Sequence, residues 1–218
     1  MAFDGAVDES MPEKGNRMNV ERAVQAFRRN GFDVSYFETA LAAIAHLEGK
    51  IQGMTVGFGD SSTLLVLDLY RRLSPANTVH DPQHGEPDVD FLETARRCLT
   101  AQVFLTSVNA LSETGEMVSL DGTGNRVAGS TFGHEKVYLV AGVNKLVPTL
   151  PDAIWRVRNV AAPRNAQRLG LKTPCALRGD RCHDCRSPDR ICNAMLIFLH
   201  KVNDMDVELV LINESLGY

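Results

Sequence analysis

The stretch GMTVGFGDSSTLLVLDLYRRL, residues 53–73, changes its pattern halfway along and thereby decides the fold class. A short apolar run that ends at residues 57–59 is typical of a strand, and an apolar helical pattern begins at about Ser61. A strand that passes through a glycine turn directly into a helix is half of a strand–helix–strand unit. Such units, repeated along a chain, build a parallel sheet with helices on its faces.

The same alternation continues in both directions from this stretch. Apolar periodicity predicts helices over residues 16–33, 36–50, 88–102 and 150–170, the last broken near Pro163. Apolar runs predict strands at 103–111, 115–122, 136–145, 194–202 and 206–215. The pattern predicts an α/β fold, a mainly parallel sheet with helices on both faces. The last two runs are close enough to pair as an antiparallel hairpin at one edge.

The bulk composition narrows the classes of partner and compartment. The 218 residues carry a net charge of −4, whereas nucleic-acid binding requires a basic face, so we expect no nucleic-acid partner. No apolar run approaches the roughly 18 residues of a membrane span. The opening MAFDGAVDESMPEKG is acidic and lacks the apolar core of a signal peptide. We therefore expect a cytoplasmic protein with a flexible arm at residues 1–16 and a single domain at 17–218.

The segment CALRGDRCHDCRSPDRIC, residues 175–192, is the densest group of soft ligands in the chain. It contains four of the five cysteines, which are Cys175, Cys182, Cys185 and Cys192. Two thiolates in a Cys-x-x-Cys turn can bind one ion, and the spacers to the outer cysteines contain Gly or Pro and can fold back. Four sulfurs could therefore converge on one centre.

Three interpretations of these cysteines compete. A disulfide pair is disfavoured in a reducing cytoplasm. Structural zinc usually takes two Cys-x-x-Cys knuckles, and only one is present. A single Cys-x-x-Cys with outlying cysteines suits an iron–sulfur cluster, which we expect here, with zinc as the alternative. His183 is an alternative ligand, and Cys98 lies on the apolar stripe of a helix as a core residue.

The glycine loop of the opening stretch is a candidate ligand site. Glycines allow a ligand to approach the backbone, and hydroxyl groups at a helix start add hydrogen-bond donors for phosphate or carboxylate. The candidate binding residues are Gly57, Gly59, Ser61, Ser62 and Thr63. The alternative is that Asp60 or Ser61 caps the helix and the glycines make a tight turn.

A second polar concentration spans residues 106–129. Glu113, Asp121 and Arg126 are the candidate catalytic residues, because a carboxylate can move a proton and an arginine can clamp a carboxylate. Asn109 and Asn125 are candidate binding residues for a hydroxyl group. The alternative is an ordinary hairpin in which Arg126 pairs with Asp121 at the surface.

Several stretches together resemble the lactate-utilisation (LUD) domain family, and in particular its branch of short proteins with a C-terminal cysteine motif. They are VGFGDSSTL, NALSETGEMVSLDGTGNRVAG, VYLVAGVNKLVPTLPDAIWRVRNVAAPRNAQRLGLKTPC and the cysteine segment. The resemblance runs from about residue 17 to 213. It implies a fold similar to that of glucosamine-6-phosphate deaminase, ribose-5-phosphate isomerase and the CoA-transferases, in which the glycine–serine loop binds an anionic substrate.

The resemblance also bears on the cysteines. Some family members belong to a complex that oxidises lactate to pyruvate through iron–sulfur centres, which favours a cluster by analogy. The long subunit of that complex has ferredoxin-type cysteine spacing, which this chain lacks, and the short subunit has no cysteine loop. The resemblance therefore brings no established catalytic residue to this chain.

The sequence thus predicts a redox accessory protein that binds a small anionic metabolite and an iron–sulfur cluster, in lactate or related organic-acid metabolism. Such a cluster requires a redox partner protein to exchange electrons with. One alternative is a non-redox enzyme similar to the sugar-phosphate isomerases, with structural zinc on the cysteines. The other is a metabolite-binding module that catalyses nothing, so the sequence leaves open whether the protein is an enzyme.

Overall fold

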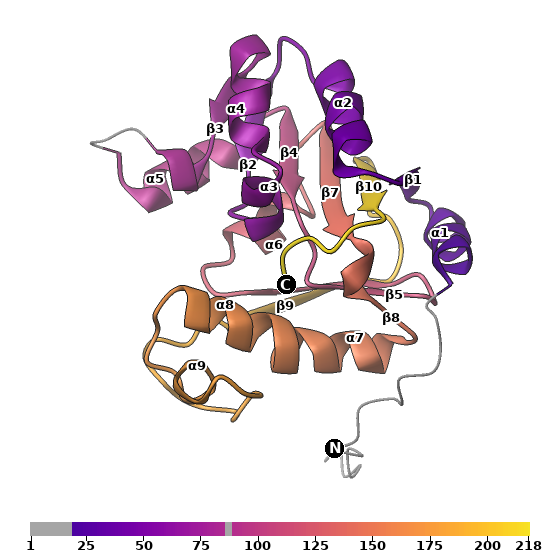
Figure 1. Ribbon diagram of the computed structural model, residues 1–218. Helices are drawn as coiled ribbons and strands as arrows, with labels where there is room; N and C mark the ends of the chain where they lie inside the picture. Colours follow the sequence, from indigo (N-terminus) through magenta and orange to yellow (C-terminus); the bar gives the residue numbers. More distant parts are fainter. Residues whose placement is uncertain (1–18, 86–88) are drawn as a thin grey trace.

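The computed structural model describes residues 19–85 and 89–218, and these form two sheets with helices around them (Figure 1). The flexible arm expected at residues 1–16 lies outside the described residues. Sheet A has six parallel strands in the order β1-β10-β7-β4-β2-β3. These strands are β1 (Asp33–Phe37), β2 (Thr55–Phe58), β3 (Thr78–His80), β4 (Val103–Thr106), β7 (Lys136–Gly142) and β10 (Asp206–Ile212). This architecture confirms the α/β fold class with a mainly parallel sheet.

Helices cover both faces of sheet A, as the alternation predicted. On one face, α1 (Val20–Arg29) and α5 (Phe91–Cys98) pack in a core that includes Phe104 and Leu209. On the other, α2 (Ala40–Lys50), α3 (Ser62–Val66) and α4 (Leu69–Leu73) pack in a core that includes Leu105 and Val210. Neighbouring residues of one strand enter opposite cores because successive side chains point to opposite faces.

Sheet B is smaller and mixed, in the order β8-β5-β6-β9. Its strands are β5 (Ala110–Ser112), β6 (Met117–Asp121), β8 (Leu146–Val147) and β9 (Ala194–Phe198). One face joins the core beneath α1, through residues such as Met117, and the other packs on Ala153 and Val157. Figure 1 shows α7 (Leu150–Arg156) and α8 (Ala162–Arg168) lying along this sheet.

The remaining helical pieces are short. They are α6 (Asn125–Gly129), α9 (Pro174–Arg178) and the 3-10 turns η1 (Ser74–Ala76), η2 (Pro82–His84) and η3 (Val143–Lys145). A π-helical segment, η4 (Val157–Ala161), joins α7 to α8, so the helical run is continuous where a break was expected near Pro163. None of the helices within the described ranges combines the length and apolar character that crossing a bilayer requires.

The expected C-terminal hairpin is wrong. β9 pairs antiparallel with β6 in sheet B, while β10 lies between β1 and β7 in the interior of sheet A. Residues 207–212 of β10 are all buried, which suits a strand covered on both faces rather than a sheet edge. A further difference is that β1 precedes α2 where helical spacing was expected to begin at residue 36.

Candidate functional site

A cavity of about 130 Å³ opens at the carboxyl ends of β2, β4 and β7, with room for about four water molecules at about 30 Å³ each. Open α/β sheets place their ligands at this edge. The turn between β6 and α6 and one face of α8 form the opposite wall. Sequence reasoning had selected two of these segments, the glycine loop and the β6–α6 turn, and the fold brings them together.

The two glycines of the loop are required by packing. A Cβ atom on Gly57 would lie 2.5 Å from the carbonyl oxygen of Cys98, and one on Gly59 would lie 2.7 Å from the Phe104 ring. Neither glycine lines the cavity, whereas Asp60, Ser61 and Ser62 do. The glycines therefore let β2 and the loop lie close to α5 and β4, and the residues after them face the cavity.

The helix after this loop is too short to act as a strong dipole. α3 has five residues, and Ser61 at its N-cap position makes no side-chain cap hydrogen bond. Thr63 is fully buried and lies behind the cavity wall. The loop therefore offers the Ser61 and Ser62 hydroxyl groups, rather than a long helix, as donors to a ligand.

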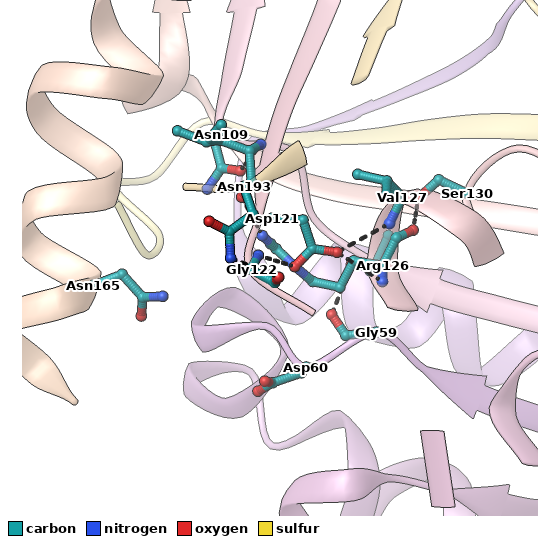
Figure 2. A network of polar contacts seen from close by, with 12 residues as sticks. Gly59, Asp60, Asn109, Asp121, Gly122, Arg126, Val127, Ser130, Asn165 and Asn193 are labelled. Carbon is teal, nitrogen blue, oxygen red and sulfur yellow. Dashed lines mark hydrogen bonds and ion pairs between the residues drawn. The ribbon is translucent and has the colours of Figure 1, made fainter. Parts of the chain in front are cut away.

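Asp60 is the charged residue of the glycine loop. Its backbone has a positive φ of 36°, which is uncommon for a residue other than glycine. Gln83 Nε2 donates a hydrogen bond to Asp60 Oδ1. Burial raises the pKa of the Asp60 carboxyl group, while the charges of Arg126 and Arg168 oppose that rise. Figure 2 shows Asp60 and Asn165 on separate elements, the glycine loop and α8.

Asp121 fixes the turn between β6 and α6. Its Oδ1 accepts from the Gly122 N–H at 2.9 Å, and its Oδ2 accepts from the N–H groups of Arg126 at 3.1 Å and Val127 at 3.3 Å (Figure 2). The Arg126 Nε lies 3.5 Å from Asp121 Oδ1, and Arg126 Nη2 donates to the Leu120 carbonyl. Both residues line the cavity, and their ion pair is largely buried there, whereas the alternative interpretation placed it at the surface.

Lys145 is a buried cavity residue that the sequence pattern does not single out. Its Nζ donates to Thr63 Oγ1 at 2.9 Å and to Ser107 Oγ at 2.8 Å, and only 2% of the residue is exposed. Burial, with the nearby charges of Arg156 and Arg126, holds its pKa well below the ordinary 10.5. Within residues 19–85 and 89–218 it forms no ion pair with a carboxylate.

The other candidate residues divide between the cavity and the turn that joins β5 to β6. Asn109 and Asn125 line the cavity, and Asn109 Oδ1 accepts from the Leu120 N–H at 2.9 Å. Arg168, which was not selected from the sequence, also lines it and donates to Asn165 Oδ1. Glu113 lies instead in the turn between β5 and β6, where it accepts from the Asn19 N–H at 2.7 Å, and it is not part of the cavity wall.

The four cysteines of the segment line a second cavity together with His183. All four are free and half-buried. Arg190 donates to the carbonyl oxygens of Cys185 and Cys192, at 2.9 Å and 3.0 Å, and so joins the middle of the loop to its C-terminal end. Burial raises the pKa of the Cys192 thiol and Arg190 opposes this rise.

The ligand atoms that line this second cavity are of the types that metal centres use. Four cysteine sulfurs are the ligands of iron–sulfur clusters and of one class of structural zinc site. In the described part of the chain, however, no three side chains of His, Cys, Asp or Glu are already arranged around a common point to hold an ion. His183 Nε2 is paired with Asp180 at 2.7 Å, which agrees with a neighbouring role better than with ligation.

Cys98 stands apart from this group, as its pattern predicted. It is 2% exposed in the core beneath α5, and burial raises the pKa of its thiol to about 11. A thiol with a raised pKa is protonated at neutral pH and is a poor nucleophile. Cys98 is therefore a packing residue.

Comparison with known proteins places these features in a family context. A profile of the LUD domain matches residues 20–212. A solved structure, that of a DUF162 family protein from Deinococcus radiodurans, is similar to 88% of this chain and 95% of its own, with 13% sequence identity and a TM-score of 0.48. No curated protein sequence matches the chain.

Proposed function

The chain belongs to the LUD domain family, and from this premise we propose a redox accessory protein that binds a small carboxylate or phosphate and an iron–sulfur cluster. The anion would occupy the cavity at the carboxyl edge of sheet A, and the cluster would occupy the cysteine loop. Lactate or a related organic acid is the metabolite class that the family favours.

The proposed anion site rests on one observation, the burial of the Lys145 amine without a carboxylate partner among the described residues. A buried amine without a carboxylate partner costs folding free energy, and an incoming anion would offset that cost by favouring the ammonium form. Arg126 and Arg168 line the same cavity and add positive charge. Ser61 and Ser62 supply hydroxyl donors, so carboxylate or phosphate oxygens have several partners here.

The proposed iron–sulfur site rests on the single cavity that all four cysteines of the loop line. Cys175, Cys182, Cys185 and Cys192 would hold the cluster, which supplies one-electron transfer when bound. Arg158 and Arg190 line the same cavity and would offset the negative charge of the thiolates. A cluster with no further electron acceptor in the described residues implies a redox partner protein.

The metal is tested on protein prepared without oxygen. We expect a brown protein with broad visible absorption and with iron and sulfide in each chain. A colourless protein that contains about one zinc per chain would contradict the cluster and favour a structural site.

The anion is tested by titration with pyruvate, lactate and inorganic phosphate, followed by calorimetry. Lys145→Met is expected to weaken binding of whichever anion binds by at least about tenfold, because one charge-assisted hydrogen bond is lost. Lys50→Met, an exposed lysine at the end of α2, is the matched control and should bind as the wild type does. Equal affinity in the two variants would exclude Lys145 as an anion ligand.

Asp60 favours a second candidate function, a non-redox enzyme similar to the sugar-phosphate isomerases with zinc on the cysteines. Its carboxyl group faces the cavity and its pKa is raised, as befits a group that accepts and returns a proton. Zinc in the purified protein, together with proton exchange into a bound sugar phosphate that Asp60→Asn abolishes, would support this function over the redox one.

A further inference from the structure

The anion cavity and the cysteine cavity share a wall. Ala162 and Ile191 line both of them, one from α8 and the other from the cysteine loop. Ile191 directly precedes Cys192 in the sequence. The side chain that closes one side of the anion cavity is therefore one residue away from a candidate metal ligand.

Ile191 is packed against the turn that holds Arg126. A Cβ atom on Gly122 would lie only 3.1 Å from Ile191 Cα and 3.2 Å from its Cβ, so a larger residue at Gly122 would displace Ile191. The Asn193 N–H donates to the Asp121 carbonyl at 2.9 Å, and Asn193 Nδ2 donates to the Gly122 carbonyl at 3.1 Å. Figure 2 shows Asn193 beside Asp121 and Gly122.

The cysteine loop is also attached to the helical wall of the anion cavity. Asn159, in the π-helical segment, accepts a hydrogen bond from the Cys182 N–H at 3.2 Å. Arg158 Nη2 lies 3.2 Å from Asp184 Oδ1. The same helical run continues into Ala161 and Ala162, which line the anion cavity. Two of its walls thus connect to the cysteine loop.

The loop has little regular structure of its own to fix these contacts. Residues 179–193 form no helix or strand between α9 and β9. A metal bound by four side chains of such a segment supplies order that its backbone hydrogen bonds do not. A metal on the cysteines would therefore add order to a loop that includes Ile191.

We infer that Ile191 is a positioning residue through which metal occupancy of the cysteine loop sets the anion affinity of the neighbouring cavity. The inference rests on the proposed function, because it needs both a metal and an anion. A metal on the four cysteines would hold Ile191 in the position against Gly122 that the structure shows, and so keep the cavity wall in place. By linkage, the anion raises the affinity of the loop for its metal by the same factor.

The test compares metal-replete wild-type protein, prepared without oxygen, with the same protein stripped by a chelator. Each form is titrated with pyruvate and with inorganic phosphate. We expect the stripped protein to bind at least about fivefold more weakly, the lower end of ordinary coupling between sites. Equal affinities of the two forms would overturn the coupling while leaving both halves of the proposed function intact.

A variant tests the role of the side chain. Ile191→Ala should keep the visible spectrum and metal content of the wild type yet bind the anion as weakly as stripped protein does. Ile154→Ala is the matched control, because Ile154 is also half-buried but lines neither cavity. An Ile191→Ala variant that binds as the control does would exclude Ile191 as the link. Absence of metal binding, or of anion binding in every form, would overturn the inference and the corresponding half of the proposed function together.

Discussion

The Lys145 amine lies among groups that disfavour its charge. Arg156 and Arg126 add repulsion to the effect of burial, and the two hydroxyl oxygens that accept its hydrogen bonds carry no net charge. A lysine whose pKa is lower in the folded protein than in the unfolded chain destabilises the fold wherever the unfolded chain is the more protonated. This cost is present at neutral pH.

The cost predicts how stability depends on pH. Between the lowered pKa of Lys145 in the folded protein and its ordinary value of 10.5, the unfolded chain binds a proton at this lysine that the folded protein does not. The free energy of unfolding therefore decreases as the pH falls through this range. Relative to Lys145→Met, the wild type should therefore gain stability from pH 7 to 10, by up to about 1.4 kcal/mol per unit. Urea unfolding of both proteins across this range measures the difference. A constant difference would show that Lys145 does not titrate in this way, and Lys50→Met should follow the wild type.

Replacing Asp60 should strengthen anion binding, whereas replacing Lys145 should weaken it. Its carboxylate opposes an anion in the cavity, so Asp60→Asn should tighten pyruvate binding at pH 8 by about tenfold, the equivalent of about 1.4 kcal/mol. Because the pKa of Asp60 is raised, the wild type should approach the variant as the pH falls. Calorimetric titration at several pH values provides the measurement.

The control for Asp60 lies far from the cavity. Asp204→Asn changes an exposed aspartate that also has a positive φ, of 55°, and asparagine tolerates this backbone region. It should leave pyruvate binding unchanged. Tightening in both variants would point to net charge rather than to the position of Asp60.

Some residues of the cavity wall could be predicted from the sequence, and others could not. The pattern selects Ser61 and Ser62 as hydroxyl donors at a helix start after a glycine turn, and Asn109 as a polar residue after a strand, and all three line the cavity. Lys145 was missed because a lysine at a strand end is usually solvated, and its burial depends on contacts with Thr63 and Ser107, which are distant in sequence. Such contacts are a property of the packed fold.

At the scale of elements, the junction of β2, β4 and α5 depends on close backbone approach. β2 pairs with β4, while α5 passes so near that the Cβ of any larger residue at Gly57 would meet the Cys98 backbone. The sequence pattern assigned this glycine to ligand approach. The structure gives it a packing role, with the ligand-facing positions beginning at Asp60.

This junction predicts a contrast between two glycine substitutions. Gly57→Ala should lower the free energy of unfolding by about 1–3 kcal/mol, because the backbone of Cys98 cannot move away cheaply. Gly49→Ala, in α2 with no atom within 4 Å of the added Cβ, should raise it by about 0.5–1 kcal/mol. Denaturant unfolding of both variants is the measurement. A loss of similar size at both positions would contradict the packing explanation.

The helical run beside sheet B shows how a local rule can be overridden. Pro163 lacks an N–H group, and this predicted a break between two helices. The chain instead widens into the π-helical segment before Pro163 and continues as α8. Packing of Ala153 and Val157 on sheet B holds the run together, and the wider turn presents Arg158 and Asn159 to the cysteine loop.

At the scale of the whole molecule, the order of the strands is the feature that sequence patterns could not supply. Apolar runs located β4, β7 and β10, but a run does not state which neighbours it will take. β10 is buried on both faces and pairs with β1 and β7, so it joins the two ends of the described chain. Its proximity in sequence to β9 suggested a hairpin, but an apolar strand that is buried on both faces is placed in the sheet interior.

This topology predicts the distribution of local stability. In metal-free protein, amide hydrogens of β7 and β10 should exchange most slowly, because both strands are interior and buried, and those of residues 179–193 should exchange fastest. Hydrogen exchange followed by mass spectrometry measures this order. Protection of residues 179–193 equal to that of β10 without metal would show that the loop is ordered by the protein alone.

The position of β10 also has a consequence for how the chain is made. β10 is the only strand that pairs with β1 within the described residues, and Ser35 meets Glu208 across a separation of 173 residues. At roughly 5–20 residues per second on the ribosome, β1 waits roughly 9–35 s for its partner to be translated. During this time β1 and, once it is translated, β7 each have an edge without the strand that pairs with it in the folded protein. Sheet A is completed only after β10 has emerged from the exit tunnel.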